Sequence, residues 1–155
     1  RMAEILRLVI PGVPPSVNVG RAKVWQVVYR VTRAYRAGVA QVTADQARKQ
    51  SYKCSDGPLR MVIRHYPPNF RGDHHNREKA LVDGICEALR INDSRIAVTS
   101  VHPRRDIRNP RVEVELGPEA LFRFQWAPIG EVAPDTTFPL SIGIPRTLNI
   151  LPNVS

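Results

Sequence analysis

The sequence predicts one compact α/β (α+β) domain, a mixed and roughly four-stranded sheet with two main helices packed on it. The chain has 155 residues and 43% hydrophobic content, enough for one core and too little for two. Four short apolar or alternating segments have strand character, and two longer segments have helical periodicity. The order strand, helix, strand, helix, strand, strand fits helices packed against a mixed sheet.

The first strand and the first helix are expected before residue 50. Segment 5–10 is an apolar run interrupted by one arginine and closed by Pro11-Gly12, which is typical of a strand in a covered sheet. Residues 24–49 mix strand and helix patterns, and we expect a helix from about Thr32, which can cap it. Gly38 costs this helix up to about 1 kcal/mol relative to alanine, so the helix relies on packing.

The second helix and three further strands follow. Segment 59–66 alternates loosely and ends at Pro67-Pro68, which predicts the second strand. A helix reaching about Arg90 buries a stripe at three- and four-residue spacing: Leu81, Val82, Ile85, Cys86 and Leu89. Segments 96–102 and 111–116 predict the third and fourth strands, and we expect the arginine-rich link 103–110 to be the tip of a hairpin between them.

The composition changes after residue 116. Six prolines are spread through short apolar pieces between Gly117 and Ser155, which excludes long regular elements there. We therefore expect a domain over residues 1–116 and a proline-rich tail or arm over residues 117–155, whose role the sequence does not reveal.

The charge of the chain favours a polyanionic partner. Lys and Arg outnumber Asp and Glu by 23 to 14, giving a formal net charge of +9, so nucleic acid is the leading expectation and a merely basic soluble protein the alternative. Arg30, Arg33 and Arg36 follow one another on the first helix, either as a solvated face or as phosphate contacts. No segment approaches a membrane span or a signal peptide, so we expect a cytoplasmic protein.

Polar groups gather between residues 71 and 93. Segment 71–83 reads as a polar loop that runs into the second helix. Lys79 and Asp83 are four residues apart on a face opposite the apolar stripe, so we expect them to be neighbours. Asp93 follows in an Asn-Asp turn and could return to the helix start only through tertiary folding.

These residues resemble the motif of the RusA family of Holliday junction resolvases, Asp-x-Asp-Asn-x-x-Lys-x-x-x-Asp with a later Asp in a turn. The matching residues are Asp73, Asn76, Lys79, Asp83 and Asp93. His75 stands where the family pattern has its second acidic residue. Segment 13–18 is similar to the Pro-Pro-Ser-Asn loop that follows the first strand in this family, and the resemblance covers roughly residues 5–116.

The resemblance implies an α/β fold and a metal-dependent endodeoxyribonuclease that cuts four-way DNA junctions by paired phosphodiester hydrolysis, acting as a homodimer. The expected metal ligands are Asp73, His75 and Asp93, with Mg²⁺ as the cofactor and Mn²⁺ as an alternative because His75 replaces a carboxylate. Lys79 would meet the scissile phosphate as the family's catalytic lysine, and Asp83 would hold Lys79 or approach the metal. His75 would otherwise orient water or phosphate as a catalytic group.

DNA contacts are expected from the motif and from the arginine-rich link. The candidates are Arg71, Asn76, Arg77, Lys79, Arg104, Arg105 and Arg108. Each motif residue also has an ordinary structural explanation: Asp73 or Asn76 as a helix cap, Lys79 with Asp83 as a surface ion pair, and Asp93 as a turn residue.

Three other functions remain open from the sequence. A catalytically weakened or inactive protein of the same fold would bind branched DNA without cutting it, with His75 marking the lost activity. A basic RNA-binding or assembly protein is a second alternative. A structural zinc site is a third, although the histidine and cysteine spacing follows no zinc-finger pattern.

Overall fold

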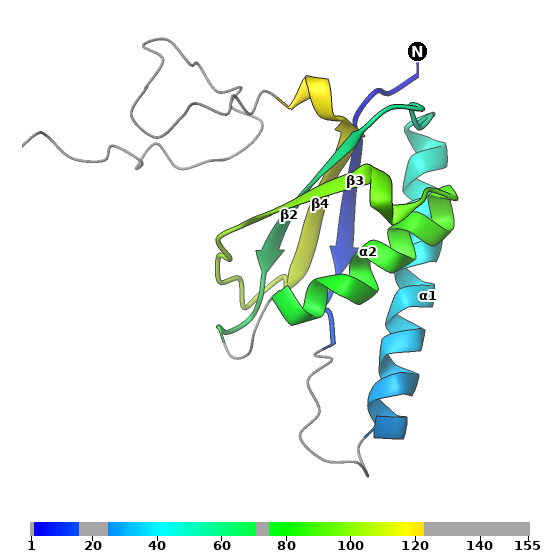
Figure 1. Ribbon diagram of the computed structural model, residues 1–155. Helices are drawn as coiled ribbons and strands as arrows, with labels where there is room; N and C mark the ends of the chain where they lie inside the picture. Colours follow the sequence, from blue (N-terminus) through cyan, green and yellow to red (C-terminus); the bar gives the residue numbers. More distant parts are fainter. Residues whose placement is uncertain (1, 16–24, 71–74, 123–155) are drawn as a thin grey trace, which may run out of the picture. The chain divides into compact units, whose positions relative to one another are not determined.

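The computed structural model describes residues 2–15, 25–70 and 75–122, with the backbone alone for Trp25, His75 and Asn76 (Figure 1). The described elements are β1 (Leu6–Pro11), α1 (Trp25–Lys49), β2 (Leu59–Tyr66), α2 (His75–Leu89), β3 (Ile96–Val101) and β4 (Arg111–Pro118), with short 3-10 helices at Asp93–Arg95 and Glu119–Leu121. The predicted α+β class is confirmed: a four-stranded mixed sheet with two helices.

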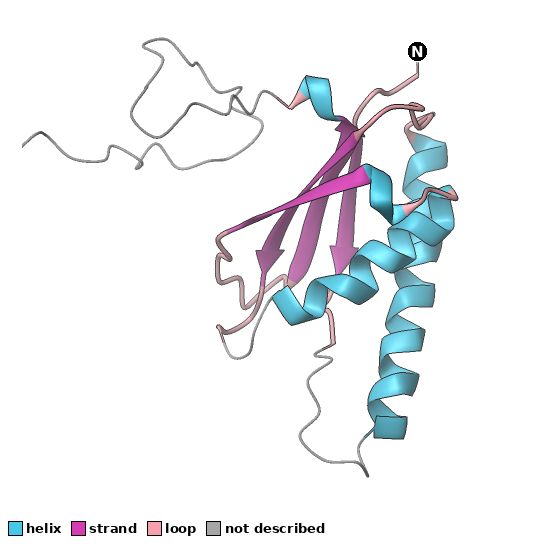
Figure 2. Ribbon diagram, in the orientation of Figure 1, coloured by secondary structure: helices cyan, strands magenta, loops and turns pink. Residues whose placement is uncertain are grey.

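The sheet has the strand order β1-β4-β2-β3, and both helices lie on the same side of it (Figure 2). β4 pairs antiparallel with β1 and with β2, whereas β3 pairs parallel with β2. Alternate strand residues turn toward the helices and are buried there, among them Leu8, Ile63 and Val114. Val39 of α1 and Leu81 and Ile85 of α2 complete this core, so burial of one face of each helix holds the motif-bearing helix on the sheet.

The first helix begins earlier than expected. α1 starts at Trp25, so Thr32 lies inside the helix and does not cap it. Val27, Tyr29 and Val31 remain about half exposed, because this part of α1 does not contribute to the hydrophobic core. This part of α1 has no stripe of buried residues that would reveal a helix in the sequence. Its β-branched and aromatic residues also favour strands, so the sequence pattern did not show the helix start.

The expected hairpin between the third and fourth strands is wrong. β3 and β4 are separated by β2, because β2, α2 and β3 form a strand-helix-strand unit that places β3 parallel to β2 on its outer side. The arginine-rich link 103–110 therefore crosses the end of β2 on its way to β4. Two backbone hydrogen bonds hold it there, from Arg104 N to the His65 oxygen at 3.0 Å and from Asp106 N to the Pro67 oxygen at 2.9 Å.

Two glutamines of α1 occupy the free edge of β1. The Gln46 amide accepts from Val9 N at 3.0 Å and donates to the Val9 oxygen at 2.8 Å. Gln50 repeats the arrangement one pleat away, with 3.0 Å from Arg7 N and 2.7 Å to the Arg7 oxygen. These four bonds satisfy backbone groups that an edge strand otherwise leaves open, and they fix the C-terminal half of α1 along β1.

Contacts group Arg1–Phe122 into one compact unit and Arg123–Ser155 into a second, which lies outside the described residues. β4 runs to Pro118 and Phe122 is buried, both beyond the limit of 116 expected for the first domain. The expectation that the proline-rich segment is a tail or arm stays a prediction. Within the described part of the chain, no helix is long and apolar enough to cross a membrane.

Candidate active site and nucleic-acid interface

The structure describes part of the motif. Arg71 and Asp73 lie outside the described residues, as do the side chains of His75 and Asn76, although the latter two form the first turn of α2. Arg77, Lys79 and Asp83 follow on α2, and Asp93 begins the 3-10 helix that connects α2 to β3. Local sequence explains why the 3-10 helix begins at Asp93: the Asn92 side chain accepts a hydrogen bond from Ser94 N at 3.0 Å and so caps this short helix.

A partly buried polar network fixes the start of α2, and sequence reasoning did not find it. The Glu78 carboxylate accepts from the Ser100 hydroxyl of β3 at 2.5 Å, and the same oxygen lies 2.9 Å from His65 Nε2 of β2. Glu78 and His65 are 13% and 4% exposed at their side chains, so the three groups satisfy one another away from water. Because Glu78 precedes Lys79, this network also fixes the helix turn that carries Lys79.

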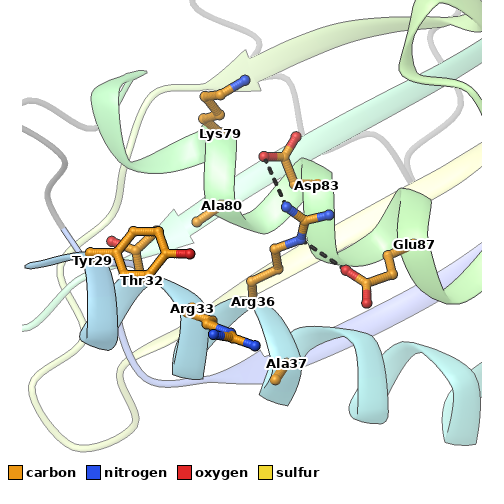
Figure 3. A pocket seen from close by; sticks show the side chains of 9 residues that line it. All are labelled: Tyr29, Thr32, Arg33, Arg36, Ala37, Lys79, Ala80, Asp83 and Glu87. Carbon is orange, nitrogen blue, oxygen red and sulfur yellow. Dashed lines mark hydrogen bonds and ion pairs between the residues drawn. The ribbon is translucent and has the colours of Figure 1, made fainter.

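Lys79 and Asp83 lie on the same side of α2 but do not pair among the described residues. Asp83 Oδ2 lies 3.9 Å from Arg36 Nη1, and Arg36 Nε donates to Glu87 Oε2 at 2.9 Å (Figure 3). In Figure 3 no dashed line joins Lys79 to Asp83, whereas one joins Asp83 to Arg36. The four-residue spacing suggested Lys79 as the partner of Asp83, but the partner is Arg36 of α1. Arg36 pairs with two carboxylates of α2 at once.

A groove of about 640 Å³ separates the exposed sides of α1 and α2. Its walls carry three cationic and two anionic side chains together with smaller groups: Tyr29, Thr32, Arg33, Arg36, Ala37, Lys79, Ala80, Asp83 and Glu87. Figure 3 shows residues of α1 on one side and of α2 on the other. Its size falls within the usual range of ligand sites, so the groove can receive a segment of an extended ligand.

A second, smaller hollow at the C-terminal end of α2 contains Asp93. It shares Arg36, Asp83 and Glu87 with the first groove and adds Cys86 and residues 90–93. Burial, followed by the negative charges of Asp93 and Asp83, raises the pKa of Cys86 from 9.0 to about 11, while Arg36 acts to lower it. Asp83 and Asp93 therefore lie close enough to Cys86 to act on the same thiol.

The length of α2 separates the two ends of the motif. From His75 to Leu89 the helix spans about 21 Å at 1.5 Å per residue, and Asp93 follows Leu89 in the sequence and lines the hollow that also contains Cys86. In ranges 2–15, 25–70 and 75–122, no group of three or more His, Cys, Asp or Glu side chains is arranged to hold a metal ion.

The arginine-rich link lies beside the segment that leads into the motif. Arg105 Nε donates to the Pro68 oxygen at 3.1 Å, two residues after the end of β2. Asp106 organises the link by accepting from Arg108 N, Asn109 N and the Arg111 guanidinium, and these hydrogen bonds lower the pKa of its carboxyl. Arg104 and Arg108 are exposed, so the link offers cations to solvent.

Pro14, in the segment that follows β1, also lies at this end of the sheet. Arg77 Nη1 of α2 donates to the Pro14 oxygen at 3.4 Å, and Gly12 N donates to the Pro110 oxygen at 2.9 Å. The first loop, the start of α2 and the arginine-rich link thus meet where β1 and β2 end. Sequence order alone could not place these three segments together.

The mixed sheet with two helices on one side, and the cationic side chains around the motif helix, define a small basic α+β domain suited to a polyanion. Residues 11–117 match the sequence model of the family described as Endodeoxyribonuclease RusA, and the chain belongs to this family. Membership implies a Holliday junction resolving endonuclease, a hydrolase that acts on DNA. A search of curated proteins found no match to this chain.

Proposed function

We propose that this protein is a metal-dependent, structure-specific endonuclease that resolves four-way DNA junctions by paired hydrolysis of opposing strands. Family membership over residues 11–117 is the observation that carries the proposal. The position of Lys79 in a groove with two arginines supports it, because hydrolysis of a phosphodiester requires stabilisation of developing negative charge. A symmetric homodimer would present one site to each of two opposing strands.

The proposed metal ligands are Asp73, His75 and Asp93, with Mg²⁺ as the cofactor and Mn²⁺ as the alternative. Bound to these residues, the metal supplies charge stabilisation and an activated water. Lys79 holds its ammonium toward the scissile phosphate, and Asp83 acts through Arg36, which it helps to orient. Arg71, Asn76, Arg77, Arg104, Arg105 and Arg108 bind the DNA backbone around the cut.

Paired nicking of a labelled four-way junction tests the proposal. We expect nicks close to the branch with Mg²⁺ or Mn²⁺, none with chelator, and none on linear duplex. Asp93→Asn and Lys79→Ala should each reduce nicking by at least about 100-fold while junction binding changes little, because each removes charge stabilisation and leaves most phosphate contacts.

Lys49→Ala is the matched control for Lys79→Ala, because Lys49 is an exposed lysine in the last turn of α1 and lies outside the groove. Full activity in both Asp93→Asn and Lys79→Ala would remove the two residues from the site. Loss of activity in Lys49→Ala to the same extent would show that the effect is not specific to the motif.

A branched-DNA-binding protein without nuclease activity is the second candidate, favoured by His75 in place of an acidic residue. It predicts tight binding of the four-way junction with no nick under either metal. The same gel assay separates the two candidates when binding and nicking are measured on the same samples.

A further inference from the structure

We propose that α1 forms a second DNA-contacting wall of the site, with Arg33 binding a backbone phosphate of the junction across the groove from Lys79. This inference rests on the proposed function and adds to it a contact from outside the motif. Arg33 and Lys79 both line the groove between α1 and α2 (Figure 3).

The charges in the groove leave two cations for a ligand. Arg36 is engaged with Asp83 and Glu87 of α2, at 3.9 and 2.9 Å, so both carboxylates face the same guanidinium. Among the residues that the structure describes, Arg33 and Lys79 make no ion pair. Three cations and two carboxylates give the groove a net charge of +1, which matches the single negative charge of one phosphodiester.

Arg36 has a distinct part in this arrangement. Without it, the carboxylates of Asp83 and Glu87 would face the groove unneutralised and would repel a phosphate. By holding both, Arg36 keeps Arg33 and Lys79 available on either side. It therefore acts as a positioning residue, and its own contact with DNA is not required.

The shape and the rim of the groove favour a nucleic acid backbone over a small anion. The groove continues toward Asp93 through three shared wall residues, so an extended chain of phosphates can follow it. Tyr29 lines the groove with 57% of its surface exposed, and such a ring offers a flat apolar surface to a sugar or an unstacked base at a branch point.

The test measures binding of Arg33→Ala to a fluorescent four-way junction in chelator, where no cutting occurs, over a series of salt concentrations. Loss of one phosphate contact should reduce the slope of log K against log salt concentration by about 0.9. Between 50 and 200 mM salt, the fall in affinity should therefore be about 3.5-fold smaller than in wild type. Arg33→Lys should retain most of the slope, since it keeps the charge.

Arg48→Ala is the matched control. Arg48 lies on the same helix, is 78% exposed at its side chain, lies outside the groove and pairs with Asp45. It removes the same charge about 22 Å from Arg33 along α1. We expect its salt slope and affinity to equal those of the wild type, and unchanged thermal melting of both variants to show that the fold is intact.

The Arg33 contact would be overturned if Arg33→Ala bound with the wild-type salt slope, or if Arg48→Ala lost as much slope as Arg33→Ala. The proposed function would still stand in either case if the wild-type protein nicked junctions. Wild-type protein that neither binds nor nicks junctions would overturn both. The two failures are therefore distinguishable in one set of measurements.

Discussion

At the scale of single residues, Cys86 reports on the acidic groups around it. Its side chain is buried on the inner face of α2, and Asp93 and Asp83 act on it together with burial to raise its pKa to about 11. A thiol with this pKa stays protonated through neutral pH. Because its usual pKa is 9.0, its contribution to stability is present below pH 9 and is lost as the pH rises toward 11.

Removing the charge of Asp93 should lower the pKa of Cys86. We expect Asp93→Asn, in a Cys54→Ala background, to react faster with an alkylating reagent between pH 8 and 10 than the Cys54→Ala parent, since more thiolate is present. Asp83→Asn should act in the same direction and more weakly, because Asp83 is the smaller of the two charge effects. Mass spectrometry over the pH series measures the reaction.

An unchanged alkylation rate in Asp93→Asn would contradict the placement of Asp93 beside the C-terminal end of α2. Asp45→Asn is the control, because Asp45 lies on α1, pairs with Arg48 and is not among the charges that act on Cys86.

Some residue relationships could be predicted from the sequence and some could not. Helical spacing put Lys79 and Asp83 on one side of α2, as the groove confirms. The same spacing suggested that they would pair, whereas Arg36, 47 positions earlier than Asp83, takes that carboxylate. Residue spacing within a helix predicts contacts inside that helix only, so it cannot predict an ion-pair partner from another element. Glu78 was missed for this reason, as its partners come from β2 and β3.

At the scale of elements, the crossing of α1 and α2 depends on Gly84. A Cβ placed on Gly84 would lie 2.8 Å from the Arg36 oxygen and 2.9 Å from two carbons of Val39. One of these neighbours is backbone, so it cannot move without shifting α1. Gly84 thus sets how closely the two walls of the groove approach, and it lies between Asp83 and the core residue Ile85.

We expect Gly84→Ala to lower the free energy of unfolding by about 1–3 kcal/mol, because the overpacked crossing outweighs the higher helix propensity of alanine. Gly38→Ala is the matched control: Gly38 is also helical, but nothing lies within 4 Å of an added Cβ. It should raise stability by up to about 1 kcal/mol. Urea unfolding monitored by circular dichroism measures both, and equal effects of the two substitutions would contradict the close crossing.

The elements themselves were largely predictable, and their pairing was less so. All four strands and both helices occur at or near the expected segments, because each has its own periodicity or strand-forming residues. The start of α1 was misplaced by several residues for want of a buried stripe. The hairpin was expected because the connection 103–110 is short enough to join adjacent strands. The prediction was wrong because β3 pairs parallel with β2, which lies between β3 and β4.

At the scale of the whole molecule, α2 keeps Lys79 and Asp93 apart. About 10 Å of helix separates Lys79 from Cys86, and Asp93 lies beside Cys86. A single phosphate group is shorter than this stretch of helix. In the proposed homodimer, we therefore expect Lys79 of one subunit and Asp93 of the other to serve the same phosphate.

Mixing two inactive variants tests this expectation. A mixed dimer of Lys79→Ala and Asp93→Asn contains one site with both groups intact if they come from different subunits, so it should recover single nicks at the junction. Two affinity tags isolate the mixed species and show that subunits have exchanged. Mixed dimers that remain inactive would place both groups in one subunit.

The amide side chains of Gln46 and Gln50 have a consequence for assembly. They occupy the outward-facing groups of Arg7 and Val9, so β1 offers little to an incoming strand. Of the described strands, only β3 forms the opposite border of the sheet. A sheet that can be extended at a single border joins one neighbour and then has no further border to offer. Strand addition between copies of this chain would therefore stop at a closed pair and would not continue into a fibre.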